Sequence, residues 1–336
     1  IDLASESIVL LKNQDVLPLR KGSRIMVTGP AAHSKAWLNG GWTFEWLGAE
    51  EKNQPADMPT FYEALCSEFG RQNVSHVKES ELPANSKMLK QKVASYDAII
   101  LALGEPPYSE FKGNITNLTL PEDQIQLIKR LSLTKKPCIA VLIEGRPRVI
   151  SPHDSLLQAI LFAGLPGSGG GTALAGIISG KIVPSGKLSF SYPSSAGHIV
   201  PYNRKPSESY LPAWPFGHGL TYTKFAYDNL TIADTIVQPN DTLHFSVNLS
   251  NKGDLPGIET VLWFVRQETG RVITRPVKKL LAFQRVFLKP GETKTITTYI
   301  IPSQQLAYPM EDGTLLLDKG EFFIETGGIF RNFFVR

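Results

Sequence analysis

The spacing of hydrophobic residues changes once along the chain, at about residue 230, and this change constrains the fold more than any other feature. Before it, short apolar runs alternate with segments of helical periodicity. After it, hydrophobic residues alternate with polar ones in short segments separated by turns. The chain of 336 residues is long enough for two domains. The pattern therefore predicts an α/β domain followed by an all-β domain.

The first part of the chain contains strands that are almost wholly apolar, as expected for the centre of a parallel sheet. These strands are predicted at residues 24–29, 97–103, 137–143 and 159–163. Helices are predicted at residues 59–69, 121–131 and 169–179. Strands and helices in this order form βαβ units, so we predict an α/β sandwich with a mostly parallel sheet over residues 1–195.

The first eleven residues have helical spacing, with Leu3, Ala4, Ile8 and Leu11 near one face. No Met and no capping sequence precede them. We therefore expect the chain to be cut from a longer protein, inside or just before a helix.

The region after residue 230 predicts an antiparallel β-sandwich over residues 226–336. Its strands are expected at residues 243–249, 258–265, 280–288, 293–301 and 321–326. Residues 196–225, rich in Pro, Gly, Ser and aromatic residues, are expected to form an ordered connector.

Composition excludes several partners. The net charge is only +4, and no run of 18 apolar residues occurs, so neither nucleic acid nor a membrane is an expected partner. Cys66 and Cys138 are too far apart for a metal motif and are expected to be buried thiols. No metal site is expected, because the histidines have no ligand spacing; they are His33, His76, His153, His198, His218 and His244.

Three loops follow predicted strand ends, where parallel α/β sheets place their ligands. Residues 39–46 contain Trp42 and Trp46, which either fold down over the sheet edge or form a stacking platform for a sugar face. Residues 104–110 contain Glu105, Tyr108 and Glu110 on a proline-stiffened loop. This second loop is either a solvated acidic loop or the carrier of a catalytic carboxylate.

The third loop, residues 164–172, is rich in glycine but lacks the Lys and Ser/Thr pair of a phosphate-binding loop. Close backbone packing is the expected role of its glycines. No G-x-S-x-G motif occurs, so a serine-hydrolase site of the α/β-hydrolase kind is not expected.

Several segments, in the same order, resemble the C-terminal half of glycoside hydrolase family 3, a family of β-glucosidases and related exo-acting enzymes. The segments are ASESIVLLKN (residues 4–13), GGWTFEW (40–46), EGRP (144–147), LPGSGG (165–170), PSGKL (184–188) and PFGHGLTYT (215–223). KPGE (289–292) and GEFFI (320–324) are similar to its fibronectin type III-like domain, whose fold is of the immunoglobulin type. The resemblance covers nearly the whole chain.

The resemblance implies that a (β/α)8 barrel precedes this part and supplies an Asp nucleophile and most contacts to the terminal sugar. It implies that Glu110 is the general acid/base, kept protonated by partial burial and a nearby carboxylate. Trp42, Trp46, Tyr108 and Glu105 are expected to bind substrate, with Glu105 also anchoring the loop. No metal and no organic cofactor are implied.

The sequence is thus interpreted as the C-terminal part of a retaining exo-β-glycosidase, periplasmic or secreted by resemblance. The expected substrates are disaccharides, oligosaccharides or aryl glycosides with a terminal β-linked sugar, and the expected partner is the barrel of the same protein. A non-catalytic carbohydrate-binding or scaffold module derived from such an enzyme is the main alternative. A structural fragment indifferent to sugars is the third.

Overall fold

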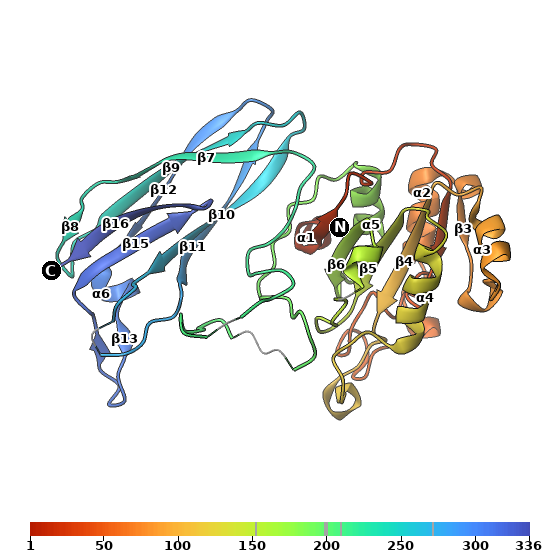
Figure 1. The fold of residues 1–336 in the computed structure, drawn as a ribbon, viewed down its shortest axis with the longest axis horizontal. Helices are drawn as coiled ribbons and strands as arrows, with labels where there is room; N and C mark the ends of the chain where they lie inside the picture. The colour runs from red at the N-terminus through yellow and green to blue at the C-terminus, as the bar shows by residue number, and fades with distance from the viewer. Residues whose placement is uncertain (152, 198–200, 209, 271) are drawn as a thin grey trace. The chain divides into compact units, whose positions relative to one another are not determined.

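The computed structural model describes residues 1–151, 153–197, 201–208, 210–270 and 272–336. These residues form two units (Figure 1), and each unit contains buried hydrophobic clusters of its own. Unit 1 comprises Ile1–Val200 and Leu211–Tyr222, and unit 2 comprises Pro201–Tyr210 and Thr223–Arg336. The expected connector, residues 196–225, includes residues 198–200 and 209, which lie outside the described residues. The expected boundaries after residues 195 and 225 remain a proposal.

Unit 1 contains a six-stranded sheet with the strand order β1-β6-β5-β4-β2-β3. All neighbouring strands are parallel except β1 and β6, which are antiparallel. The strands are β1 (Val9–Asn13), β2 (Ile25–Thr28), β3 (Val74–His76), β4 (Ala98–Gly104), β5 (Cys138–Ile143) and β6 (Ala159–Gly164). The predicted α/β sandwich with a mostly parallel sheet is confirmed.

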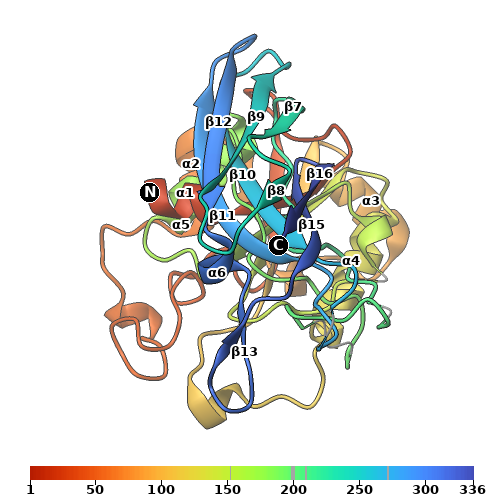
Figure 2. The ribbon, with the colours of Figure 1, turned by 90° about the vertical axis from the view of Figure 1, so that its left-hand side faces the viewer.

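Helices cover both faces of this sheet. The helices are α1 (Asp2–Ser7), α2 (Phe61–Phe69), α3 (Ser86–Val93), α4 (Glu122–Ser132) and α5 (Gly170–Ser179). Figure 2 shows α1, α2 and α5 on one side of unit 1 and α3 and α4 on the other. Successive strand residues point to opposite faces, so Val27 of β2 joins the core beneath α1, α2 and α5, while Met26 joins the core beneath α3 and α4. Single 3-10 turns are η1 (Glu51–Asn53), η2 (Arg71–Asn73), η3 (Glu79–Glu81), η4 (Glu110–Gly113) and η5 (Asp154–Leu156).

The expectation of a helix through residue 11 is wrong. Helix α1 ends at Ser7, Ile8 is extended with ψ of 127°, and residues 9–13 form β1 against β6. Val9 is buried in one core of unit 1 and Leu10 in the other. An unbroken apolar run is typical of a strand buried on both faces. Burial of residues 9–13 against β6 therefore outweighs the helical spacing of their hydrophobic residues.

The glycine-rich segment of residues 164–172, which runs into the first turn of α5, packs closely, as predicted. A Cβ at Gly171 would lie 3.1 Å from the backbone oxygens of Pro59 and Thr60, next to the start of α2. Thr60 itself caps α2, accepting the Glu63 N–H while the Glu63 side chain accepts the Thr60 N–H. Glycine here lets the two helices meet on the sheet.

Unit 2 is a β-sandwich of a five-stranded sheet, β11-β10-β15-β16-β8, and a three-stranded sheet, β12-β9-β7. Its elements are β7 (Phe225–Ile232), β8 (Ile236–Val237), β9 (Leu243–Asn251), β10 (Gly257–Arg266), β11 (Lys279–Leu288), β12 (Thr293–Ile300), α6 (Pro302–Gln305), β13 (Tyr308–Pro309), β14 (Leu315–Leu316), β15 (Gly320–Thr326) and β16 (Ile329–Val335). Phe245, Trp263 and Phe333 fill the core between the sheets. The predicted β-sandwich is confirmed, although β7 and β16, which lack regular alternation, were not predicted.

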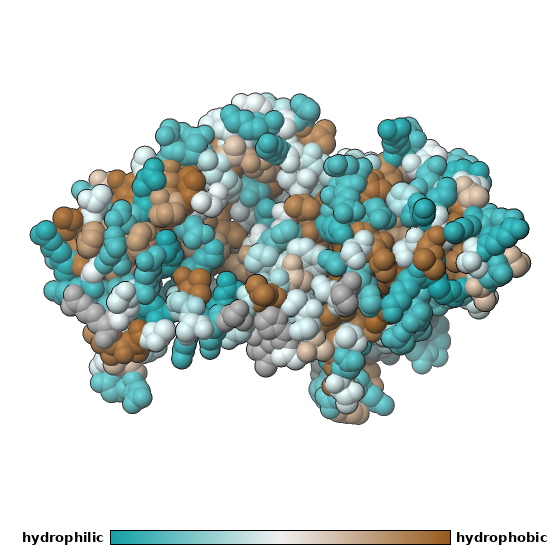
Figure 3. Space-filling model, in the orientation of Figure 1, coloured by the Kyte–Doolittle hydropathy of each residue, from teal (hydrophilic) through white to brown (hydrophobic). Residues whose placement is uncertain are grey.

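Within the described residues, no helix combines the length and apolar character needed to cross a bilayer. On the face drawn in Figure 3, hydrophobic and hydrophilic residues are intermixed over both units. Cys66 and Cys138 are both buried free thiols, as predicted. No group of three metal-ligating side chains is present in the part of the chain that the structure describes, which does not include His198.

Candidate active site

The loop after β4 carries the proposed acid/base. Gly104 ends the strand at φ of 134°, where a Cβ would lie 1.9 Å from the carbonyl oxygen of Ile143. Only glycine therefore lets the chain leave the sheet here. Glu110 follows at the start of η4, exposed and with φ of 47°. A non-glycine residue in this conformation is strained, and such strain is concentrated at functional sites.

The loop of residues 39–48 lies directly against the loop of Glu110. The Ser109 hydroxyl donates to the carbonyl oxygen of Trp46 at 2.8 Å, and the ring of Trp46 meets that of Phe111 at 6.2 Å between centroids. A Cβ at Gly41 would lie 2.4 Å from the carbonyl oxygen of Tyr108, so glycine permits this close approach.

The tryptophans are exposed rather than folded over the sheet edge. Trp42 is 72% exposed and Trp46 is 44% exposed, with ring centroids 6.3 Å apart. Phe44 and Phe111 are exposed beside them in the same two loops. We call Trp42, Phe44, Trp46 and Phe111 the aromatic platform. Large apolar groups left in water indicate a surface that covers a ligand or another part of a protein.

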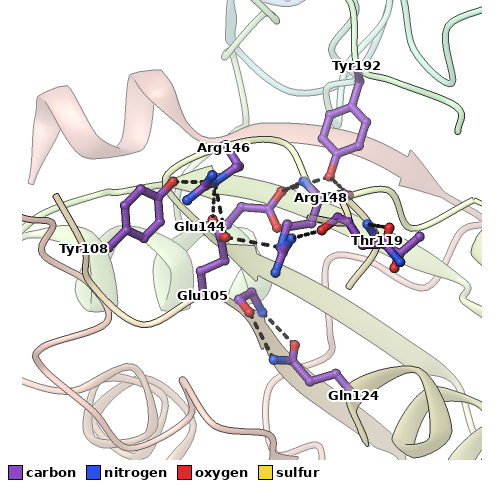
Figure 4. A network of polar contacts seen from close by, with 10 residues as sticks. Glu105, Tyr108, Thr119, Gln124, Glu144, Arg146, Arg148 and Tyr192 are labelled. Atoms are coloured by element: carbon purple, nitrogen blue, oxygen red, sulfur yellow. Dashed lines mark hydrogen bonds and ion pairs between the residues drawn. The ribbon is translucent and has the colours of Figure 1, made fainter. Parts of the chain in front are cut away.

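Glu105, the other carboxylate of the loop, is buried and paired with two arginines (Figure 4). Its Oε1 lies 3.3 Å from Nε of Arg146 and 3.2 Å from Nε of Arg148. Arg148 also donates from Nη1 to the carbonyl oxygen of Asn117 at 2.7 Å. The Gln124 side chain of α4 donates to the carbonyl of Gly104 at 3.0 Å and accepts its N–H at 2.9 Å. These contacts fix the point at which the loop leaves β4.

Tyr108 is the loop residue whose side chain contacts this charged cluster. Nε of Arg146 donates to the Tyr108 hydroxyl at 2.8 Å, and the guanidinium carbon lies 4.1 Å from the centre of the ring (Figure 4). Gly113 and Gly145 make room for the ring, since a Cβ at either position would lie within 2.7 Å of it or its hydroxyl. Burial, together with the Glu105 carboxylate, raises the pKa of Tyr108.

Glu144, at the end of β5, is a second buried carboxyl with different neighbours. Its Oε1 accepts the N–H of Arg148 at 3.1 Å and lies 2.9 Å from the Tyr192 hydroxyl, while its Oε2 is buried without a hydrogen-bond partner. Complete burial raises the pKa of Glu144 to about 8. The Tyr192 hydroxyl also lies 2.6 Å from the carbonyl oxygen of Arg148. The Tyr192 hydroxyl has a single proton, which it can donate to the carbonyl oxygen of Arg148. The contact with Glu144 then needs a proton on the Glu144 carboxyl, which donates to the Tyr192 oxygen.

The structure separates the expected site residues into two groups. Trp42, Trp46 and Glu110 are exposed in adjoining loops, whereas Glu105 and Tyr108 belong to the arginine cluster beneath them. Glu110 is exposed in this chain, as are neighbouring Phe111 and Lys112. The expected partial burial of Glu110 stays a prediction for the enzyme with its barrel.

Sequence reasoning did not assign roles to Glu144, Arg146 and Arg148. They follow a buried strand directly and include two arginines and a carboxylate within five residues. Charged residues clustered at a strand end indicate a site, so this pattern could have pointed to these three residues. The motif EGRP was used only to recognise the family.

Comparison with family models gives two matches along the chain. Residues 8–222 match the glycosyl hydrolase family 3 C-terminal domain, and residues 259–328 match the fibronectin type III-like domain. The resemblance found in the motifs is thereby confirmed, as is the type of the second domain.

Two curated relatives illustrate the similarity. The chain is 32% identical to the lysosomal β-glucosidase of Dictyostelium discoideum over 352 residues, covering 96% of this chain and 42% of that protein. It is 30% identical to the periplasmic β-glucosidase of Salmonella typhimurium, covering 93% of this chain and 46% of that protein.

Among solved structures, the β-glucosidase of Listeria innocua in complex with glucose has a TM-score of 0.87 and 28% identity. The superposition covers 99% of this chain and 49% of the Listeria chain. The chain therefore spans about half the length of the relatives it matches, and it corresponds to their C-terminal part.

Proposed function

This chain belongs to glycoside hydrolase family 3, and we propose that it is the acid/base-bearing part of a retaining exo-β-glycosidase. A single observation carries the proposal: a strained, exposed carboxylate, Glu110, stands beside an aromatic platform at the carboxyl edge of the sheet. Carboxylates perform the acid/base chemistry of glycoside hydrolysis, and aromatic faces stack on the C–H faces of sugars.

The proposed substrate is a terminal β-linked sugar on a saccharide or an aryl group. The Dictyostelium and Salmonella relatives are named β-glucosidases, and the Listeria structure holds glucose. Trp42 and Trp46 would stack against the departing part of the substrate, with Glu110 beside the glycosidic oxygen. Tyr108 and Glu105 would support the loop rather than bind the substrate directly, because their polar atoms are already paired with Arg146 and Arg148.

The proposed reaction has two steps. Glu110 donates its proton to the glycosidic oxygen while an Asp from the barrel attacks the anomeric carbon, and the aglycone leaves. Glu110 then removes a proton from water, which attacks the glycosyl-enzyme and releases the sugar with retained configuration. This reaction needs the two carboxyl groups about 5–5.5 Å apart. Because Glu110 is exposed here, the burial that keeps it protonated has to come from the barrel and the substrate.

We also propose that the protein acts outside the cytoplasm, in a periplasm or after secretion. One relative is named periplasmic and another lysosomal. A compartment that receives external glycans would suit an exo-acting glycosidase with no strong surface charge.

The test uses the assembled enzyme, which we define as residues 1–336 preceded by the N-terminal part of the Salmonella relative. Glu110→Gln should lower kcat/KM for an unactivated disaccharide by about 10²–10⁴-fold. It should lower kcat/KM much less for a dinitrophenyl glycoside, whose leaving group needs no proton. Steady-state kinetics on both substrates measure the difference.

Glu122→Gln is the matched control, since Glu122 is an exposed carboxylate in the first turn of α4. It should leave both substrates unaffected. An equal loss on both substrates in Glu110→Gln, or a larger leaving-group dependence in Glu105→Gln, contradicts the assignment.

A further inference from the structure

We propose that Arg146 is a positioning residue for Glu110, acting through Tyr108 to hold the loop of residues 106–113 against the aromatic platform. This inference rests on the proposed function of Glu110 and reassigns Tyr108 and Glu105 from substrate contact to support of the loop. It follows from the polar contacts that the side chains of Tyr108 and Ser109 make on the two sides of the loop.

The loop borders an open cleft of ≈ 410 Å³, which is lined by Leu47, Pro107, Tyr108, Lys112, Arg146 and Arg148 among others. Glu110, Phe111 and Lys112, at the tip, are exposed. A loop that borders an open cleft keeps one conformation only if particular contacts restrict it.

Polar contacts restrict this loop on two sides, in addition to the ring contact between Phe111 and Trp46. On one side, the Ser109 hydroxyl donates to Trp46 at 2.8 Å. On the other, Nε of Arg146 donates to the Tyr108 hydroxyl at 2.8 Å, and the guanidinium carbon lies 4.1 Å from the centre of the ring. Tyr108 and Ser109 directly precede Glu110, so these contacts set the direction in which the Glu110 backbone leaves them.

Arg146 in turn is fixed by Glu105. The Nε–H of Arg146 lies 3.3 Å from both carboxylate oxygens of Glu105, which is only 4% exposed and anchored at the end of β4. A guanidinium presents its donors in a fixed planar arrangement, whereas an ammonium is a compact point charge on a flexible stem. Nε of Arg146 lies close to both the Tyr108 hydroxyl and the Glu105 carboxylate, so Arg146 links the sheet edge to the loop with a geometry that lysine would not reproduce.

The first test follows hydrogen–deuterium exchange of backbone amides in the full 336-residue chain. Arg146→Gln should speed exchange of amides in residues 106–113 by about tenfold or more, and Arg146→Lys should do nearly the same. Arg130→Gln is the matched control, because Arg130 is also half-buried and donates to the carbonyls of Leu82 and Pro83. It should leave residues 106–113 unchanged. Unchanged exchange of this loop in Arg146→Gln would overturn the proposal.

Tyr108→Phe is a milder variant that keeps the ring and removes only the hydroxyl that Arg146 contacts. Because it leaves the ion pairs of Glu105 intact, it should retain the fold even where Arg146→Gln destabilises unit 1. Its loop amides should exchange faster than those of the unsubstituted chain and more slowly than those of Arg146→Gln.

The second test measures kcat/KM in the assembled enzyme. Arg146→Gln and Tyr108→Phe should lower kcat/KM for the disaccharide at least about tenfold more than for the dinitrophenyl glycoside, because a misplaced Glu110 delivers its proton poorly. Equal losses on the two substrates would mean a merely structural role and overturn the proposal. Failure of the proposed function appears separately, as an absence of leaving-group dependence in Glu110→Gln itself.

Discussion

At the scale of single residues, two buried carboxyl groups at neighbouring strand ends have opposite surroundings. Glu105 faces the side chains of Arg146 and Arg148. Glu144 faces a tyrosine hydroxyl and a backbone N–H, and one of its oxygens has no hydrogen-bond partner. Burying an ionised carboxylate without a cation is costly, so the pKa of Glu144 rises to about 8. Environment, not residue type, decides which of the two carries a charge.

This difference predicts how stability depends on pH. The native state holds the Glu144 proton up to about pH 8, whereas the unfolded chain releases it near pH 4.5. Between these values the native state binds more protons, so the free energy of unfolding falls as pH rises, by up to about 1.4 kcal/mol per pH unit.

Glu144→Gln should remove this dependence. Urea unfolding of unit 1 at pH 5 and pH 8 should show the variant gaining stability relative to the unsubstituted protein as pH increases. Glu122→Gln, at an exposed position, should show no such gain. A constant difference between Glu144→Gln and the unsubstituted protein across this range would contradict a neutral Glu144.

At the scale of secondary-structure elements, the site exists because β4 and β5 are adjacent and parallel. Their carboxyl ends therefore deliver Glu105 from one loop and Glu144, Arg146 and Arg148 from the next to one edge of the sheet. Gly104 makes this possible, since β4 remains paired to its last residue and the chain then turns sharply.

Gly104→Ala should consequently destabilise unit 1 by about 3 kcal/mol or more, from both an unfavourable φ and a clash with β5. Gly22→Ala is the control within the same unit. Gly22 also has a positive φ, of 85°, but no atom lies within 4 Å of the added Cβ. It should cost only about 1–2 kcal/mol. Urea unfolding curves measure both, and equal losses would mean that backbone conformation alone matters.

At the scale of the whole molecule, the chain contains a proposed proton donor without its proposed nucleophile. Each unit has its own hydrophobic core, but the chain spans about half the length of its relatives. Only one of the two carboxylates needed for retaining hydrolysis is expected to come from this part.

The purified 336-residue chain should therefore release no nitrophenol from an aryl β-glucoside above the uncatalysed rate. The assembled enzyme, assayed at the same molar concentration, should hydrolyse it. Turnover by the chain alone, retained after repeated purification and abolished by Glu110→Gln, would refute this division of the catalytic residues.

The amino-acid sequence by itself determined the two-domain order, most of the strands and the family. Hydrophobic period depends on local spacing, and the motifs EGRP and GGWTFEW are contiguous, so both can be read without knowing what packs where. The sequence also indicated the loops that carry Trp42, Trp46 and Glu110, because carboxyl ends of parallel strands gather at one edge.

The tertiary structure decided what depends on contacts between distant segments. Residues 9–13 form a strand because pairing with β6 buries their apolar side chains on both faces of the sheet. Glu105 and Tyr108 were brought under Arg146, some forty positions away in the chain, and Glu144 was enclosed with Tyr192 and kept neutral. Burial and ion pairing are properties of assembled surroundings, so no local pattern specifies them.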